Sequence, residues 1–427
     1  MQKIVWLILL FLSINAQGQQ KKMTDVQLNT LISKAVTNYP AIKEMEEQMK
    51  AFPIKEGLAK SAYQPGISTD INYRYNDPVS EAQFGPNKVQ FAPYNNYSAT
   101  IGINQLIYDF GKTKVQLEKS NAEMNLFMAN FDNTKNAIAY QVAGIYYTII
   151  FVHQAMNVQQ QQIDVLKENE KIINAKYLNG EALRYDVLST QVKTSTATNK
   201  LTDLKMQLDK QFVLLEWLTG EKQKESFNYV YTEDQIKLIT NIDNWQNTNE
   251  NAILTQKKLA LLAFEKKYAS IQSRPSLIGN LSGGYRNGIQ PNIETIRPIS
   301  TIGVGLAIPI NSTSRPKMQA RLAQVSINTT KKSFTTIEAG IQKDINIVLA
   351  DYHNLEEKTV TTNLLVNQAE QAFQLAQVRF KAGLITSAEL LSSQSNVEEA
   401  KLQQVQLQYL MQLDKLESNK IIGTKLW

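Results

Sequence analysis

The chain has 427 residues, 43% of them hydrophobic and 20% charged, with a formal net charge of +6 and no cysteine. The lack of cysteine excludes disulfides, thiolate metal sites, a cysteine nucleophile and a lipid-modified N-terminal cysteine. Lysines and acidic residues alternate along the chain instead of forming a basic cluster, so the composition argues against nucleic acid as a partner.

No combination of residues predicts catalysis or a cofactor. His153 and His353 are the two histidines, and each lies within a stretch predicted to be helical, without converging ligands for a metal. Gly111-Lys112-Thr113 lacks the first glycine of a phosphate-binding loop, and Asp109-Phe110-Gly111 lacks the catalytic-loop partner of a kinase. We therefore expect neither an enzyme nor a cofactor.

Residues 1–18 have the features of a secretory signal peptide. Lys3 precedes the apolar run Ile4 to Leu12, and small and polar residues follow around Ala16. The apolar run is too short to cross a bilayer as a helix, and no later stretch reaches 18 uninterrupted apolar residues. We expect a chain that is exported from the cytoplasm.

Residues 19–63 are expected to form N-terminal helices. The helical region from Met23 to Lys60 is predicted to break at Pro40 and Pro53. The residues around Asn38-Tyr39-Pro40 form a turn between two helices, because the residue before a proline is disfavoured in helical geometry.

The pattern changes to strands in residues 64–110. Apolar and aromatic side chains alternate with polar ones from Ile67 to Tyr75, which indicates a strand with one apolar face. A loop is predicted over residues 76–93, and a second one-sided strand over residues 94–108. Asp109 is the expected N-cap of the helix that follows.

Residues 111–220 are predicted to form a long helical hairpin. The first helix runs from Lys112 to Leu178, roughly 100 Å at the α-helical rise. The second is expected over residues 185–218, after a reversal at Gly180. Apolar residues recur in alternating steps of four and three along the first helix, as in a coiled coil: Ile138, Val142, Ile145, Ile149, Val152, Met156, Gln159, Ile163, Leu166, Glu170, Ile173 and Tyr177.

The same order of elements then recurs. Residues 221–272 are expected to hold an irregular segment and a connecting helix over 249–272. Residues 273–311 contain two further strands, beginning near Leu277 and Ile302, with Asn311 in the capping position. Residues 312–423 repeat the helical hairpin, with Gly383 and Gly423 standing 203 residues after Gly180 and Gly220.

The seam of the second hairpin keeps this 203-residue offset without a gap: Ile341, Ile345, Val348, Tyr352, Leu355, Thr359, Thr362, Val366, Ala369, Phe373, Ala376 and Phe380. The fold class that follows is mainly α with a small β part. Two long coiled-coil helical hairpins arise from an internal duplication, and each is preceded by a pair of strands.

The four strands suggest a membrane. Each one-sided strand of about ten residues spans roughly 33 Å, enough to cross an outer membrane at a tilt. The alternative is a small soluble sheet packed on the helices. Lipid tolerates no unpaired sheet edge and bacterial barrels start at about eight strands. A membrane location therefore needs several copies of the chain in one barrel, and the sequence alone does not determine how many copies.

At this point the chain resembles the TolC family of outer-membrane efflux proteins. The resemblance rests on the Asn38-Tyr39-Pro40 turn, the strand-to-helix junctions at 106–109 and 308–311, the duplication, and the two hairpin tips. It implies a homotrimer in the outer-membrane lipid, with a shared twelve-stranded barrel and a periplasmic tunnel of twelve helices. A belt around the tunnel would include residues 221–248.

The resemblance also implies that the tips form the periplasmic entrance, opened by an adaptor protein and an inner-membrane pump. The expected pore constriction then comprises Glu389, Ser392, Asp186 and Ser189. The alternative role for both carboxylates is to stabilise the first turn of a returning helix. The expected adaptor contacts, which could instead be ordinary helix turns, are Asn179, Gly180, Glu181, Leu183, Ala382, Gly383, Leu384 and Thr386.

We therefore predict an outer-membrane exit duct of a tripartite efflux or type I secretion system in a Gram-negative bacterium. A periplasmic or cell-surface coiled-coil scaffold without a pore is the alternative from the residues. It explains the heptads and the signal peptide but not the one-sided strands.

Overall fold

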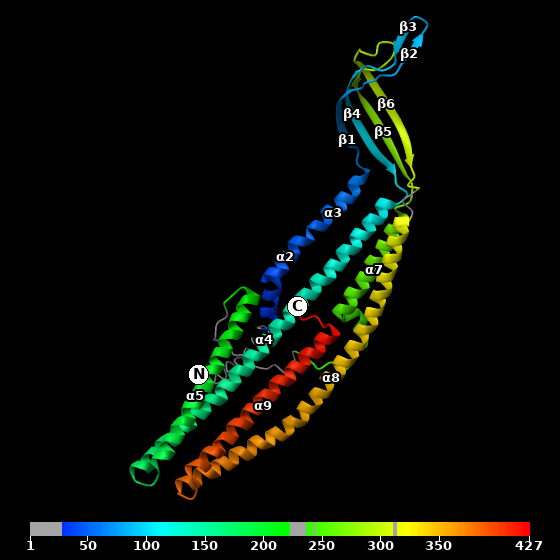
Figure 1. Cartoon of the computed structure of the whole chain (residues 1–427). Coiled ribbons are helices and arrows are strands. Elements are labelled where there is room, and N and C mark those ends of the chain that lie inside the picture. Colours follow the sequence, from blue (N-terminus) through cyan, green and yellow to red (C-terminus); the bar gives the residue numbers. More distant parts are fainter. Residues whose placement is uncertain (1–27, 223–235, 242, 244, 311–313) are drawn as a thin grey trace, which may run out of the picture. The chain divides into compact units, whose positions relative to one another are not determined.

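The computed structural model describes residues 28–222, 236–241, 243, 245–310 and 314–427. The expected signal peptide (1–18), most of the irregular segment 221–248 and the expected cap Asn311 lie outside the described residues. The described chain divides into a helical unit, within residues 1–46, 129–253 and 334–427, and a sheet unit, residues 47–128 and 254–333. Figure 1 shows the elements of both units.

The sheet unit contains one four-stranded antiparallel sheet. Its strands are β1 (Gly66–Tyr75), β4 (Asn95–Tyr108), β5 (Ser276–Arg286) and β6 (Arg297–Ala307), in the order β1-β4-β5-β6. The two predicted strand pairs are therefore neighbours in one sheet, joined between β4 and β5. Strands β1 and β6 are the edges, and neither has a second partner within the described chain.

The strand register separates an apolar face from a polar one. Ile67 lies opposite Ile103, Ile103 opposite Leu281, and Leu281 opposite Ile302, so one row of apolar side chains crosses all four strands. The side chains of this face are exposed in the single chain, with Ile302 84% exposed. The parallel row Ser68, Gly102, Ser282 and Thr301 belongs to the polar face.

The stretch predicted as a plain loop contains a second, two-stranded sheet, so that prediction was wrong in part. Strands β2 (Glu81–Phe84) and β3 (Asn87–Gln90) pair around a turn in which Gly85 has φ of 62°. An ion pair between Lys88 and Glu81 links the two strands. Four-residue polar strands show too short an alternation to be recognised in a sequence.

The N-terminal helices differ from prediction at one proline. Residues 28–38 are helical, and α2 (Pro40–Met49) begins at the predicted turn. The next break falls at Lys50, and Pro53 is the third residue of α3 (Ala51–Lys60). A proline in the first turn removes a backbone N–H that has no partner within the helix, so it does not interrupt the helix.

Asp109 joins the sheet to the first long helix, α4 (Lys112–Leu178), whose bounds match the prediction. Its carboxylate accepts hydrogen bonds from the backbone N–H of Gly111 at 2.9 Å and of Thr113 at 2.6 Å. The Tyr63 hydroxyl donates to it at 2.8 Å, and Asp109 is only 2% exposed. The predicted cap is confirmed, and its hydrogen bonds hold the pKa of the Asp109 carboxyl below its usual value despite burial.

The helical unit places four long helices side by side. The returning helices are α5 (Arg184–Thr219) and α9 (Ser387–Ile422), and α8 (Ser314–Lys381) is the counterpart of α4. Hydrogen bonds and an ion pair between neighbouring helices give the order α5-α4-α9-α8, with α4 and α9 in the middle (Figure 1). A short helix, α6 (Trp245–Thr248), lies at the end of the irregular segment, and α7 (Glu250–Ile271) follows it.

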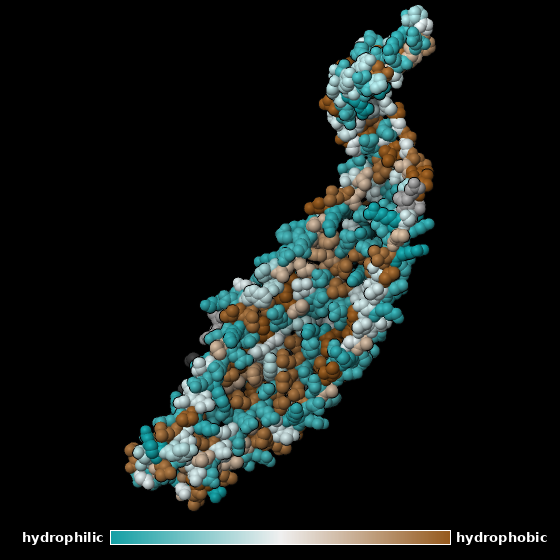
Figure 2. Space-filling model, viewed as in Figure 1, coloured by the Kyte–Doolittle hydropathy of each residue, from teal (hydrophilic) through white to brown (hydrophobic). Residues whose placement is uncertain are grey.

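The predicted 4-3 seam is confirmed as the packing surface. All twelve seam residues of α8 are buried or half-buried, as are all those of α4 except Tyr177. Apolar side chains also lie at the surface of the helices, as Figure 2 shows. None of the described helices combines the length and apolar content needed to cross a bilayer.

Candidate pore entrance at the helical tips

Both helical hairpins reverse through the same backbone motif. At the first tip Gly180 has φ of 80°, and Glu181 N–H donates to Lys176 C=O at 2.8 Å. At the second tip Gly383 has φ of 75°, and Leu384 N–H donates to Arg379 C=O at 2.9 Å. This is the Schellman arrangement, which needs a left-handed residue after the helix and so favours glycine there.

The returning helices start differently at the two tips. Thr386 caps α9 with a full capping box: its hydroxyl accepts from Glu389 N–H at 3.2 Å, and the Glu389 carboxylate accepts from Thr386 N–H at 2.7 Å. Leu183 precedes α5 and has no side-chain acceptor. Only the return bond forms there, from Leu183 N–H to the Asp186 carboxylate at 3.0 Å.

The Glu389 carboxylate thus makes the contacts expected of a helix-capping residue. Its bonds with the backbone N–H and hydroxyl of Thr386 lower its pKa below the ordinary glutamate value. Glu389 and Ser392, one turn later, are both exposed. The Glu389 carboxylate therefore faces solvent at the start of α9.

Asp186 links the two tips to each other. The Ser387 hydroxyl, in the first turn of α9, donates a hydrogen bond to the second oxygen of the Asp186 carboxylate. Beside this bond lies a shared apolar cluster of Ile173, Val187, Phe380 and Leu390, drawn from all four helices. The Lys176 ammonium lies 5.5 Å from the centroid of the Phe380 ring. The first and second tips therefore pack as one structure.

Ser387 and its hydrogen bond to Asp186 were not predicted from the sequence. The structure brings Asp186 to Ser387 rather than to Glu389, and Ser189 lies half-buried one turn further along α5. The Thr386-Ser-Ala-Glu389 pattern is a capping-box signature, so the local role of Glu389 could have been read from the residues. Nothing in the sequence indicates that the two tips touch at Ser387.

The residues expected to contact an adaptor lie at the solvent-facing end of the hairpins. Asn179, Gly180 and Glu181 are exposed at the first tip, and Ala382, Gly383 and Thr386 at the second. Each tip also presents large apolar side chains to solvent: Leu178 (76% exposed), Leu183 (70%) and Leu384 (68%). Apolar side chains exposed in this way suit contact with another protein.

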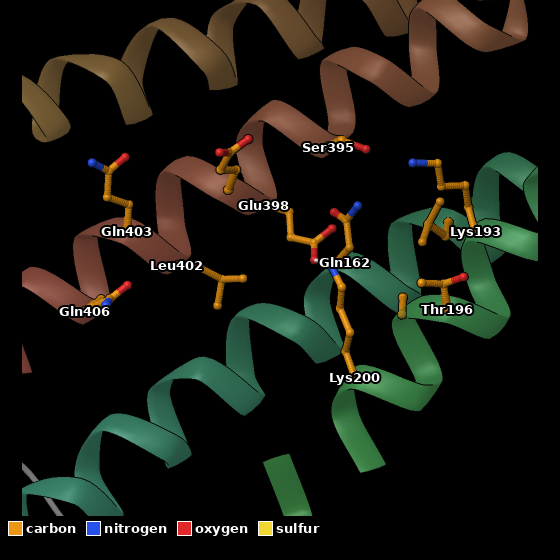
Figure 3. Close-up of a pocket in the computed structure, with 12 residues that line it drawn as sticks. Gln162, Lys193, Thr196, Lys200, Ser395, Glu398, Leu402, Gln403 and Gln406 are labelled. Atoms are coloured by element: carbon orange, nitrogen blue, oxygen red, sulfur yellow. Dashed lines mark hydrogen bonds and ion pairs between the residues drawn. The ribbon is translucent and has the colours of Figure 1, made fainter. Parts of the chain in front are cut away.

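A groove begins two to three turns beyond the tips, between α5 and α9 and over α4. It has a volume of about 660 Å³, and Figure 3 shows polar side chains from the three helices around it. Lys200 of α5 and Glu398 of α9 form an ion pair of 2.9 Å beside the groove. Its lining combines lysine, glutamate, glutamine and serine side chains with the apolar Leu166, Ala197 and Leu402.

Comparison with known proteins matches this architecture. The model of the family described as outer membrane efflux protein matches residues 31–221 and 254–424. No curated protein sequence matches the chain.

Solved structures share the fold at low sequence identity. The chain is similar to CusC (13% identity, TM-score 0.77, covering 93% of this chain and 92% of CusC). It is similar to VceC of Vibrio cholerae, with 16% identity and a TM-score of 0.75, covering 94% of this chain and 97% of VceC. It is also similar to the Campylobacter jejuni CmeC outer membrane channel, with 14% identity and a TM-score of 0.74, covering 93% of this chain and 85% of CmeC.

The family match covers both duplicated halves, and the matched range includes the tips and the strands. Proteins of this family are outer-membrane channels rather than enzymes, with a large periplasmic helical part, and they work as trimers with adaptor and inner-membrane pump proteins. The chain belongs to the outer membrane efflux protein family.

Proposed function

We propose that three copies of this chain form an exit duct whose periplasmic entrance lies at the helical tips and is opened by an adaptor protein and an inner-membrane pump. Strands β1, β4, β5 and β6 of the three copies would share one barrel, and helices α4, α5, α8 and α9 would form the tunnel. The pump supplies the energy, and this chain supplies the conduit for efflux or type I secretion.

The main support for this proposal is that the sheet ends in unpaired strand edges and the row of helices ends in exposed apolar stripes, both of which another copy of the chain can cover. The edge strands β1 and β6 have free backbone groups, which lipid does not tolerate. The outer helices α5 and α8 each carry a second, exposed apolar stripe. On α5 it comprises Tyr185, Leu188, Val192, Met206, Val213 and Trp217; on α8 it includes Val360, Leu364, Leu375 and Val378.

These two stripes lie at matching heights along the helical unit. Gln191 of α5 bonds to Glu170 of α4, and the adjacent Asn169 bonds to Gln394 of α9. Lys401, two turns further along α9, pairs with Glu370 of α8. Because α8 and α9 are antiparallel, the level of Gln191 corresponds to about residue 377 on α8. Val192 of one copy can therefore meet Leu375 of the next, and the contact repeats around a ring.

Engineered disulfides test this assembly directly, because the chain has no cysteine of its own. The double variant Val192→Cys with Leu375→Cys should give a covalent trimer on a non-reducing gel after mild oxidation in outer membranes. The control pair Val192→Cys with Val360→Cys separates the thiols by about 24 Å along the helix axis, so it should stay monomeric. A folded protein that stays monomeric with both pairs would contradict the shared duct.

The proposed entrance rests on the geometry of the tips. The Asp186–Ser387 hydrogen bond and the apolar cluster around Phe380 hold the two tips of one copy together. The exposed Leu178, Leu183 and Leu384 would receive the adaptor, and its contacts would replace the bonds between the tips. In the trimer, Glu389 and Asp186 would each recur three times around the axis and favour cations over anions there.

A further inference from the structure

The polar face of the four-stranded sheet carries three arginines at one end. Arg286 of β5 lies directly opposite Arg297 of β6, and the same row continues through Ser98 of β4 to Asn72 of β1. Arg74 follows Asn72 on the same face, one step nearer the strand end. The three arginines therefore lie on one face of the sheet, and their positions along the strand direction differ by no more than two residues.

These arginines have no acidic partner. Within the part of the chain that the structure describes, no carboxylate lies at ion-pair distance from Arg74, Arg286 or Arg297, and the nearby Lys88–Glu81 pair is self-contained. Like charges directly opposite each other destabilise an antiparallel pair. Arg297 makes one long hydrogen bond, 3.4 Å to the Gln290 carbonyl. A sheet that keeps two facing arginines without a counter-charge has unused capacity to bind an anion.

The positions next to the arginines on the same face hold mainly small residues, with one larger apolar side chain, Ile299, opposite Gly284. The small residues are Ser98, Thr100, Gly102, Ser282 and Gly284. The opposite face carries the exposed apolar side chains that suit lipid, so the arginine face is the interior of the proposed barrel. Arginines placed in contact with lipid would be strongly unfavourable, which supports the same orientation.

We propose that Arg74, Arg286 and Arg297 form an anion-binding collar inside the outer mouth of the duct. This inference rests on the proposed trimer, in which three arginines from each of three copies make a ring of nine. Its ligands are multivalent anions with phosphate or carboxylate groups, which arginine binds through paired N–H donors. The collar draws such solutes toward the exit, in contrast to the acidic entrance at the tips.

The acidic groups near the collar do not cancel it. Asp70 lies on the same face two positions from Asn72, whose amide donates to it, and its row lies further from the strand end. Asp77 and Glu294 belong to the connecting loops. The polar face of the four-stranded sheet carries three arginines and one aspartate, so its net charge is positive.

Current block by inorganic pyrophosphate tests the collar. The purified trimer is placed in a planar bilayer of zwitterionic phosphatidylcholine in 0.1 M KCl, and pyrophosphate is added at the side of the sheet loops. Wild type should be blocked, and Arg286→Gln with Arg297→Gln should need at least tenfold more pyrophosphate for half-block. The difference should shrink in 1 M KCl, where the Debye length falls to about 3 Å. The zwitterionic lipid excludes anionic headgroups as the source of the effect.

Two controls separate the possible outcomes. Lys43→Gln with Lys358→Gln removes two exposed charges from the helical unit and should leave the block unchanged. Asp70→Asn should strengthen the block or leave it unchanged. If the double variant fails to assemble, the single variants Arg74→Gln and Arg286→Gln should each weaken the block. Equal block in conducting wild type and arginine variants would overturn the collar alone, whereas a folded wild type that never conducts would overturn the proposed duct and the collar with it.

Discussion

The two helical hairpins share one backbone plan but differ in how they are buried. The middle of α4 is apolar on nearly every side: Tyr146, Tyr147 and Ile150 are at most 2% exposed, although none belongs to the 4-3 seam. The equivalent positions of α8, 203 residues later, are Leu349, Ala350 and His353, of which the last two are exposed. The longer helix of the first hairpin, α4, is therefore a central helix, whereas its counterpart α8 in the second hairpin is an edge helix.

The two copies therefore share the buried 4-3 seam of the long helix but differ in the packing around the rest of that helix. A helix with neighbours on both sides needs apolar residues all round, whereas a helix at an edge needs one buried stripe. In the proposed trimer, the exposed stripe on α8 contacts another copy of the chain.

The largest effect on stability is expected on the face of α4 that is buried where the equivalent face of α8 is exposed. Ile150→Ala should lower the free energy of unfolding by about 4 kcal/mol, because it leaves a cavity in a fully packed site. His353→Ala, at the equivalent exposed position, should change it by less than about 0.5 kcal/mol. Thermal unfolding of both variants in detergent measures the contrast. Similar losses for the two would show that α4 and α8 are not buried differently.

The ends of the returning helices give the next contrast. Gly220 and Gly423 both adopt positive φ, but a Cβ at Gly423 would lie 2.2 Å from the Thr248 carbonyl oxygen, whereas at Gly220 the nearest atom is Asn38 Cβ at 3.5 Å. Gly423→Ala should therefore destabilise by about 3 kcal/mol and Gly220→Ala by about 1 kcal/mol. Chemical denaturation of the two variants tests this order, and a reversed order would contradict the close approach at Gly423.

A pH-dependent difference is expected at Asp414 of α9, where α5 has Gln211. Burial, together with the charge of Asp351, raises the pKa of Asp414 to about 6. The folded state then binds a proton more tightly than the unfolded state, so stability falls as pH rises from about 4 to 6 and stays low above it.

Asp414→Asn should consequently stabilise by about 1 kcal/mol at pH 7.5, after allowance for solvent screening, and much less at pH 4. Melting temperatures across this pH range measure the effect. Gln211→Asn is the matched control and should give a shift that does not depend on pH. A benefit of Asp414→Asn that is equal at both pH values would contradict the raised pKa.

The smallest effect on stability is expected at the tips, where the expected effect on channel opening is nevertheless large. Ser387→Ala removes the donor to Asp186, a bond worth about 1 kcal/mol at a partly exposed site. In single-channel recordings it should increase the open fraction several-fold, while Ser392→Ala, at an exposed position without such a bond, should not. Glu389→Ala should reduce cation preference without releasing the link between the tips.

The outcome of that recording separates two roles. An unchanged open fraction in Ser387→Ala would remove the bond between the tips as a closing element and leave the apolar cluster around Phe380 as the remaining candidate. Loss of cation preference in Ser387→Ala but not in Glu389→Ala would exchange the roles proposed for the two sites.

Much of the architecture was available from the sequence because it depends on local rules. The 203-residue repeat, the 4-3 seam and the glycines at the tips specify helices, packing faces and reversal points without knowledge of neighbours. The bounds of α4 and the cap at Asp109 followed in the same way. The β2–β3 hairpin and the position of Pro53 were missed, since a four-residue strand and a proline in a first turn give little local signal.

The sequence by itself determined the duplicated hairpins, the one-sided strands and the residues at the tips, because periodicity and backbone preference act within a few residues. Only the tertiary structure decided that α4 lies inside and α8 at an edge, that Asp186 meets Ser387, and that Arg286 faces Arg297. These are contacts between residues 11 to more than 200 positions apart. They depend on how helices and strands pair in space, which no local pattern encodes.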